Sequence, residues 1–218
     1  MAIPGSQGRN AVYQHRDLSY GLVAAVDIEN FSRANTLGQV LLQKRLSRVL
    51  DIAARRARLD RASWYCQPRG DGELAVLPHG VRVATVLADF TDRLVEALAQ
   101  STMTYLDGPR LRIRVAMHHG TLAPGAFGPA GDAPIVACRL LDAAAARAAL
   151  RANPTANLVL VISDRLYQDV IQTRFNGLEP ARFRPIRTTA KGATYCGYLC
   201  VGTPRDPGAT QLRPAAGQ

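Results

Sequence analysis

The sequence positions of two acidic residues predict that both lie at one end of a β-sheet. Asp27 ends an apolar run within LSYGLVAAVDIENFS (18–32), which predicts a buried strand. Asp71 lies in QPRGDGELAVLP (67–78), where an Arg-Gly-Asp-Gly turn between two apolar runs predicts a hairpin. Carboxylates on neighbouring strands can meet and bind hard cations such as Mg²⁺ or Mn²⁺. Two such ions about 4 Å apart clamp the attacking and leaving oxygens of phosphoryl transfer.

The segment after Asp27 has the features of an anion site, because it leads from a strand into a predicted helix. Acids that bind metals and amides that bind phosphates belong together in a site for a nucleoside triphosphate. From spacing alone another interpretation stays open, in which Asp27 caps a helix and Asp71 only forms a turn. The residues whose backbone N–H groups are candidates for phosphate binding are Glu29, Asn30, Phe31 and Ser32.

Composition limits the classes of protein to consider. The chain has 218 residues, of which 47% are apolar and 20% charged, which is enough for one folded domain. The formal net charge of +10 favours anionic partners. The arginines are scattered and no basic run carries interleaved aromatics, so nucleic acid is not favoured. Four cysteines lack metal-ligand spacing, and no signal peptide or membrane-spanning run is present, so we expect free thiols and a cytoplasmic protein.

The order of predicted elements is strand, helix, hairpin, helix, strand, and then a helix and further strands. The opening β-α-β-β-α-β unit predicts a ferredoxin-like α+β fold, with one sheet and helices on one of its faces. We expect a flexible arm over 1–17, one domain over 18–202 and a disordered tail over 203–218. After the first strand, helices are predicted over 33–58, 81–100, 135–152 and 163–173, and strands over 63–68, 73–78, 111–120, 157–163, 183–189 and 193–201.

Five motifs, in this order, resemble those of class III nucleotidyl cyclase domains, the family of adenylate and guanylate cyclases. VDIENFS resembles the first metal motif, and RGDGELAVL resembles the Gly-Asp hairpin with the second metal Asp. LRIRVAMHHG resembles the strand that leads to His-x-Gly. GDAPIVACRLLDAA resembles the start of the helix that carries the catalytic Asn and Arg, and AKGATYCGYL resembles the closing hairpin. The motifs cover residues 20 to 201. The resemblance implies the cyclase fold, a ferredoxin-like core with an additional C-terminal helix and strands.

The resemblance also implies a two-metal mechanism. Asp27 and Asp71, with the Ile28 carbonyl, would hold two Mg²⁺ or Mn²⁺ ions. The ribose 3′-hydroxyl of a nucleoside triphosphate would attack the α-phosphate, and pyrophosphate would leave.

In this family two chains pair head to tail, and each site borrows residues from the partner, so a homodimer is implied. Arg139 matches the Arg that stabilises charge on the α-phosphate in the transition state. Lys191 or Arg187, in the closing hairpin, is expected to reach the outer phosphates.

Three positions depart from the family pattern. Gln67 stands where adenine-selecting cyclases have Lys, and Gly128 stands where they have the partner Asp. Such a site should bind adenine poorly, whereas the Gln67 amide can donate and accept hydrogen bonds to uracil or cytosine. Ile135 stands in place of the Asn that orients the ribose. The alternative for Gln67 is that it only faces solvent on an edge strand.

A small cyclase unit with altered base-selecting positions resembles the pyrimidine cyclases of the Pycsar antiphage system. That resemblance implies a cyclic UMP or cyclic CMP product, which a separate effector protein reads. Three other interpretations stay open. They are an adenylate or guanylate cyclase with atypical base contacts, an inactive cyclase-like module that binds nucleotides or another protein, and a basic RNA-binding ferredoxin-like domain.

Overall fold

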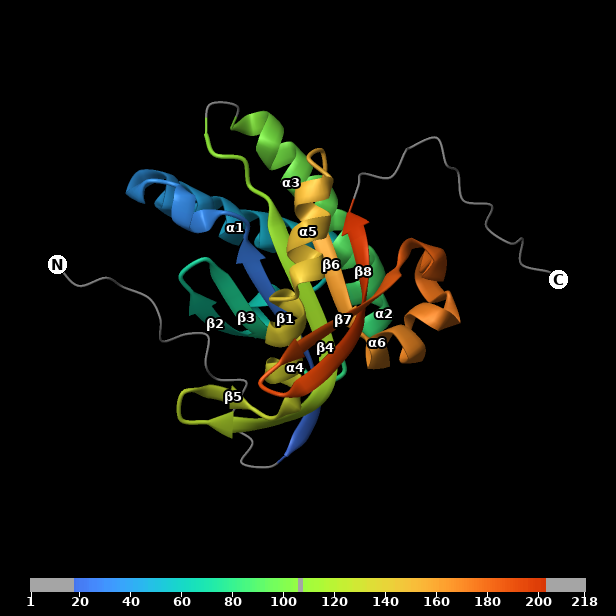
Figure 1. The fold of residues 1–218 in the computed structure, drawn as a ribbon. Helices are drawn as coiled ribbons and strands as arrows, with labels where there is room; N and C mark the ends of the chain where they lie inside the picture. Colours follow the sequence, from blue (N-terminus) through green and yellow to red (C-terminus); the bar gives the residue numbers. More distant parts are fainter. Residues whose placement is uncertain (1–17, 106–107, 203–218) are drawn as a thin grey trace.

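The computed structural model describes residues 18–105 and 108–202 (Figure 1). The predicted arm (1–17) and tail (203–218) lie outside the described residues. One mixed sheet runs in the order β2-β3-β1-β4-β6-β8-β7, and β5 pairs with β4. The strands are β1 Ser19–Ile28, β2 Tyr65–Arg69, β3 Gly72–Val76, β4 Ile113–Gly125, β5 Gly128–Ala130, β6 Leu158–Ser163, β7 Arg184–Ala190 and β8 Ala193–Gly202.

The helices follow the predicted pattern with two breaks, one within 135–152 and one at Val170, where the helix predicted over 163–173 gives way to a 3-10 turn. The region 135–152 forms two helices, because the chain turns at Asp142 and Ala143. The helices are α1 Thr36–Arg56, α2 Val83–Thr85, the π-helix η3 Val86–Phe90, α3 Thr91–Thr104, α4 Asp132–Leu141, α5 Ala144–Ala152 and α6 Asp164–Asp169. Short 3-10 turns are η1 Phe31–Arg33, η2 Arg61–Ser63, η4 Ile171–Thr173, η5 Phe175–Gly177 and η6 Pro180–Arg182.

The ferredoxin-like prediction is confirmed by the pairing of the first four strands. β1 lies between β3 and β4 and is antiparallel to both, and β2 completes the edge beyond β3. The later strands β6, β8 and β7 extend the sheet on the other side of β4. β1 is therefore an inner strand, and residues 21–28 are all buried.

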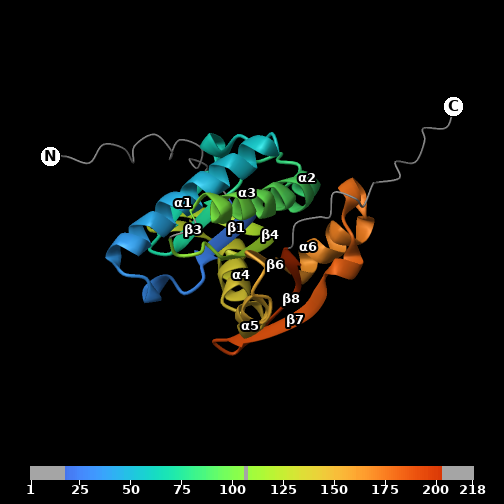
Figure 2. The same cartoon turned by 90° about the horizontal axis from the view of Figure 1, so that it is seen from above.

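Helices cover both faces of the sheet, which corrects the prediction that they lie on one face. Figure 2 shows α1 and α3 on one side and α4 and α5 on the other. The misleading signal was the alternation in LRIRVAMHHG, which is typical of a half-buried strand. Arg112 and Arg114 supply that alternation, but they pair with acids at the end of the sheet. Farther along β4, Val115, Ala116 and Met117 are all buried.

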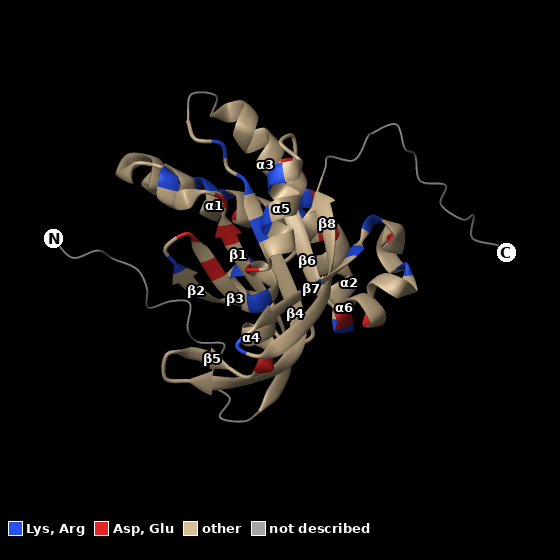
Figure 3. Ribbon diagram, viewed as in Figure 1, with Lys and Arg blue, Asp and Glu red and all other residues tan. Residues whose placement is uncertain are grey.

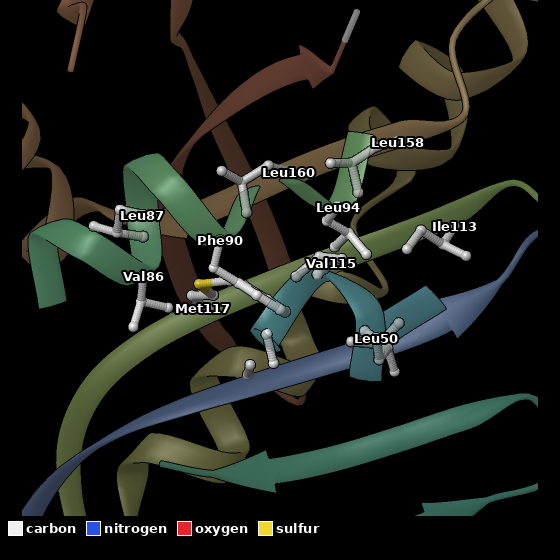
Figure 4. Close-up of a cluster of buried hydrophobic side chains, with 14 of the residues drawn as sticks. Leu50, Val86, Leu87, Phe90, Leu94, Ile113, Val115, Met117, Leu158 and Leu160 are labelled. Atoms are coloured by element: carbon white, nitrogen blue, oxygen red, sulfur yellow. The ribbon is translucent and has the colours of Figure 1, made fainter. Parts of the chain in front are cut away.

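Two hydrophobic cores hold these layers together. The core under α1 and α3 contains large side chains from helices and strands, among them Phe90, Leu94 and Met117 (Figure 4). The core under α4 and α5 is rich in alanine, including Ala137 and Ala146, both fully buried. Small side chains let α4 lie close to β1 and β4, since packing density must be kept without voids. No helix within 18–105 or 108–202 has the length and apolarity needed to cross a membrane.

Candidate active site

The fold brings Asp27 and Asp71 together at one end of the sheet. Asp27 pairs with Gly72 in the register of β1 and β3, and the Ile28 N–H donates to the Asp71 carbonyl at 2.8 Å. Burial raises the pKa of the Asp27 carboxyl, the hydrogen bond from Arg114 opposes that rise, and the charge of Asp71 adds to it. The backbones of Asp27 and Asp71 thus meet where β1 and the β2–β3 turn pair.

Arg114 is a partner of Asp27 that the sequence did not reveal. The two residues lie opposite each other in the register of β1 and β4. Arg114 donates from Nε to Oδ1 at 2.8 Å and from Nη2 to Oδ2 at 2.5 Å. Their side chains are only 11% and 10% exposed. This bidentate contact fixes the orientation of the Asp27 carboxylate.

Glu29 is engaged in a second pair of the same kind. Its carboxylate lies 2.9 Å from Arg112 Nη1, and its backbone N–H donates to the Arg112 carbonyl at 2.8 Å. The Glu29 N–H is therefore used within the sheet, which narrows the predicted phosphate-binding segment to Asn30, Phe31 and Ser32. The N–H groups of these three residues donate no hydrogen bond to any residue that the structure describes.

A pocket of about 290 Å³ opens beside these groups. Asn30 adopts the left-handed conformation, with φ of 56°, and begins the η1 turn at one wall of the pocket. The residues that line it are Ile28, Glu29, Asn30, Phe31, Ser32, Asp71, Arg114, Arg147 and Arg151. The pocket thus combines carboxylate, backbone amide and guanidinium groups, as a site for a metal-bound phosphate requires.

The donor chemistry fits a hard divalent cation. The described residues contain no cluster of three or more His, Cys, Asp or Glu side chains that could hold a metal ion. Mg²⁺ is commonly bound by one or two carboxylates together with substrate phosphates and water. The contact with Arg114 leaves a second lone pair on each oxygen of Asp27. Asp27 and Asp71 can therefore hold a cation once a triphosphate supplies further oxygen ligands.

Arg139 and Ile135 lie away from this pocket. They are four residues apart on α4 and so share one face of the helix. Ile135 is 52% exposed, and Arg139 makes no hydrogen bond or ion pair within the described part of the chain. Lys191 and Arg187 are exposed in the β7–β8 hairpin, and neither lines the pocket. Within one chain, then, the structure does not bring these residues to Asp27 and Asp71.

Gln67 and Gly128, two of the departures from the family pattern, lie in contact. The Gln67 amide nitrogen donates to the Phe127 carbonyl at 2.9 Å. A Cβ atom on Gly128 would lie 2.8 Å from the Gln67 side-chain oxygen, and the Gly128 φ of +120° disfavours any side chain there. Gln67 is thus half-buried and held by the β4–β5 hairpin, not merely solvated.

His118 is the buried member of the His118-His119 pair, since neighbouring residues on a strand point to opposite faces. Its Nδ1 lies 2.8 Å from the Ser163 hydroxyl, which also caps α6. Burial lowers the pKa of His118, and the nearby Asp132 carboxylate only partly opposes this shift. None of the four cysteines, all of which the structure describes, forms a disulfide, as expected.

The chain matches no protein-family model and no curated protein by sequence. Its fold is similar to that of solved cyclase domains. The adenylate/guanylate cyclase/hydrolase from Silicibacter pomeroyi superposes with a TM-score of 0.60 at 19% identity, over 86% of this chain and 99% of that one. A guanylyl cyclase gives 0.58 at 13% identity, over 90% and 98%. The dimeric guanylyl cyclase domain of a fusion protein from the fungus Blastocladiella emersonii gives 0.50 at 18% identity, over 85% and 98%. The predicted class III cyclase fold is therefore confirmed.

Proposed function

We propose that this protein is a metal-dependent nucleotidyl cyclase, which converts a nucleoside triphosphate to the 3′,5′-cyclic nucleotide and pyrophosphate. The observation that carries the proposal is the meeting of Asp27 and Asp71 beside a pocket lined by the free backbone N–H groups of Asn30, Phe31 and Ser32. The similarity of the fold to cyclase domains supports it.

In this proposal each group at the pocket has one task. Asp27, Asp71 and the Ile28 carbonyl would hold two Mg²⁺ or Mn²⁺ ions, whose charge would acidify the ribose 3′-hydroxyl and neutralise the triphosphate. Arg114 keeps the Asp27 carboxylate in one orientation. The free N–H groups of Asn30, Phe31 and Ser32 bind phosphate oxygens.

A second copy of the chain completes the site. The fungal cyclase domain of similar fold is dimeric, and symmetric pairing of two copies gives two equivalent sites. Head-to-tail pairing would bring the exposed face of α4 to the partner's pocket. Arg139 then stabilises the charge on the α-phosphate. Lys191 or Arg187 reaches the outer phosphates.

The favoured substrate is a pyrimidine triphosphate, UTP or CTP. Gln67 stands in place of the Lys ammonium of adenine-selecting cyclases, and Gly128, beside it, stands in place of their Asp carboxylate. The Gln67 amide keeps an acceptor oxygen and a second N–H for a base edge. We further propose that the cyclic nucleotide is a second messenger in antiphage defence, read by a separate effector protein.

Incubation with each of the four nucleoside triphosphates and Mn²⁺, followed by identification of the product, tests the proposal. We expect cyclic UMP or cyclic CMP. Cyclic AMP as the main product would exclude the pyrimidine preference and favour atypical base contacts. Absence of any cyclic product would favour an inactive nucleotide-binding module, a candidate that the replacement of Asn by Ile135 supports.

Mixing two impaired variants tests the shared site. Alone, Asp27→Ala should be inactive and Arg139→Ala should keep about 1% of the wild-type rate, but a mixed dimer holds one intact site. Random pairing should restore about a quarter of wild-type activity, since half of the dimers are mixed and each has one working site of two. No recovery after exchange of subunits would show that Arg139 acts within its own chain or not at all.

A further inference from the structure

Two arginines of α5 face the pocket that Asp71 lines. Arg147 and Arg151 belong to its lining, together with the phosphate-binding segment. They are four residues apart and so lie on one face of α5. Figure 3 shows basic segments on α5 near the acidic end of β1. Neither arginine lies in a motif of the family resemblance.

The acids at the pocket do not neutralise these two arginines. Asp27 and Glu29 are already paired with arginines of β4. Of the acids that line the pocket, this leaves Asp71 unpaired with any cation within the described residues. Asp71, which the proposed function assigns to metal binding, is therefore the unpaired acid of the pocket that Arg147 and Arg151 line.

The two guanidinium groups also make little interaction with other side chains outside the pocket. Arg151 makes no hydrogen bond or ion pair with the described residues. Arg147 Nη1 lies 3.8 Å from Asp142 Oδ1, and the two side chains are 43% and 64% exposed. An exposed pair at that distance contributes little in water. Both side chains are therefore free to bind an anion.

The position of α5 is fixed relative to the phosphate-binding segment. Arg112 Nη2 donates to the carbonyl oxygens of Leu150 and Asn153 at the end of α5, and Nη1 of the same side chain pairs with Glu29. The same end of the helix is anchored by the fully buried Leu150. One arginine thus ties the end of α5 to the residue that precedes Asn30.

We propose that Arg147 and Arg151 bind the β- and γ-phosphates of the nucleoside triphosphate, and the pyrophosphate after cyclisation. The guanidinium fork matches phosphate oxygens in a bidentate manner. The inference rests on the proposed function, since it adds α5 to the partner-chain hairpin, with its Lys191 or Arg187, as a ligand of the outer phosphates of that substrate. It places cationic groups in the lining of the same pocket as the free N–H groups of Asn30, Phe31 and Ser32, so that both kinds of donor can bind the phosphates.

Binding of inorganic tripolyphosphate to the full chain, measured by calorimetry with Mn²⁺ present, tests the subsite without turnover. The double variant Arg147→Ala and Arg151→Ala should raise the dissociation constant about 10-fold or more, as loss of charge-assisted hydrogen bonds requires. The matched control is Arg55→Ala with Arg56→Ala, two exposed arginines of α1 outside the pocket. Wild-type affinity in the first variant, or an equal loss in the control, would overturn the proposal. Thermal unfolding checks that each variant is folded.

Kinetics separate this inference from the cyclase proposal. If a nucleoside triphosphate is cyclised, the α5 double variant should raise KM more than it lowers kcat. Turnover with wild-type KM and wild-type tripolyphosphate affinity would refute the subsite and leave the cyclase intact. Tripolyphosphate binding that depends on Arg147 and Arg151, without turnover of any triphosphate, would support the subsite and refute the cyclase.

Discussion

The two ends of the candidate site differ in how they relate to the family pattern. The acidic end, which comprises Asp27, Asp71 and the segment 28–32, keeps the groups that the resemblance implies. The base end, which comprises Gln67, Gly128 and Ile135, replaces all three expected residues. A triphosphate is common to every nucleotide, whereas the base distinguishes one nucleotide from another. The proposal of a retained reaction on a changed substrate rests on this contrast.

The two ends also differ in construction. The acidic end is built from paired strands, where register and cross-strand ion pairs fix the side chains. The base end is built from elements at the edge and surface of the sheet. Gln67 lies on the edge strand β2, Gly128 begins the short strand β5 beside the 96% exposed Phe127, and Ile135 is half exposed on α4. Substitutions at such surface positions usually change stability little, so the base end should vary with less effect on the fold.

The largest effect is expected from the acidic end. Asp27→Ala and Asp71→Ala should each abolish product, because a lone carboxylate cannot hold both ions against water. Product formation and Mn²⁺ binding measure the effect. Asp89→Ala, at an exposed acid of η3, is the control and should leave both unchanged. Normal turnover in either site variant would separate these acids from the reaction.

The next largest effect is expected at Arg139. Arg139→Ala should lower kcat roughly 10²-fold with a smaller change in KM, since it removes a group that acts in the transition state. Steady-state kinetics on the preferred triphosphate measure this. A variant with normal kcat would show that the exposed face of α4 carries no catalytic group, and the two ends would then not belong to one site.

Gly72 tests how tightly the acidic end is packed. A Cβ atom there would lie 1.8 Å from the Val26 carbonyl oxygen, whereas one on Gly70 would meet nothing within 4 Å. Gly72→Ala should lower the free energy of unfolding by about 1–3 kcal/mol, the usual cost of overpacking. Gly70→Ala, in the same hairpin, should have little effect. Denaturant unfolding compares the two, and equal stabilities would mean that the β1–β3 register is loose.

The smallest effect is a pH dependence near the start of α4. Burial lowers the pKa of His118 from its usual 6.5 and also lowers that of His119. Below about pH 6.5 the unfolded chain binds protons that the folded chain does not, so the free energy of unfolding should fall as pH falls. Unfolding curves from pH 8 to pH 5 measure this slope, and His118→Gln should reduce it. A slope of opposite sign would place His118 in contact with an acid strong enough to raise its pKa.

Several features could be predicted because local patterns specify them. The change from apolar strand to amphipathic helix after Asp27, and the Gly-flanked turn at Asp71, led to the correct order of the first elements. Others depended on distant residues. The pairs of Arg114 with Asp27 and Arg112 with Glu29 need the β1–β4 register, which connects positions about 87 residues apart. The Gln67–Phe127 contact likewise joins two hairpins.

The kinds of chemistry present at this site follow from residue types that can be read along the chain. Acids end one strand and occupy one turn, amides follow them, and the groups expected to read adenine are missing. Which of these groups meet is a property of the folded chain, because sheet register and helix packing are set by contacts between distant segments. That is why Arg114 at Asp27, α5 at the phosphate pocket, and Gly128 against Gln67 became visible only in three dimensions.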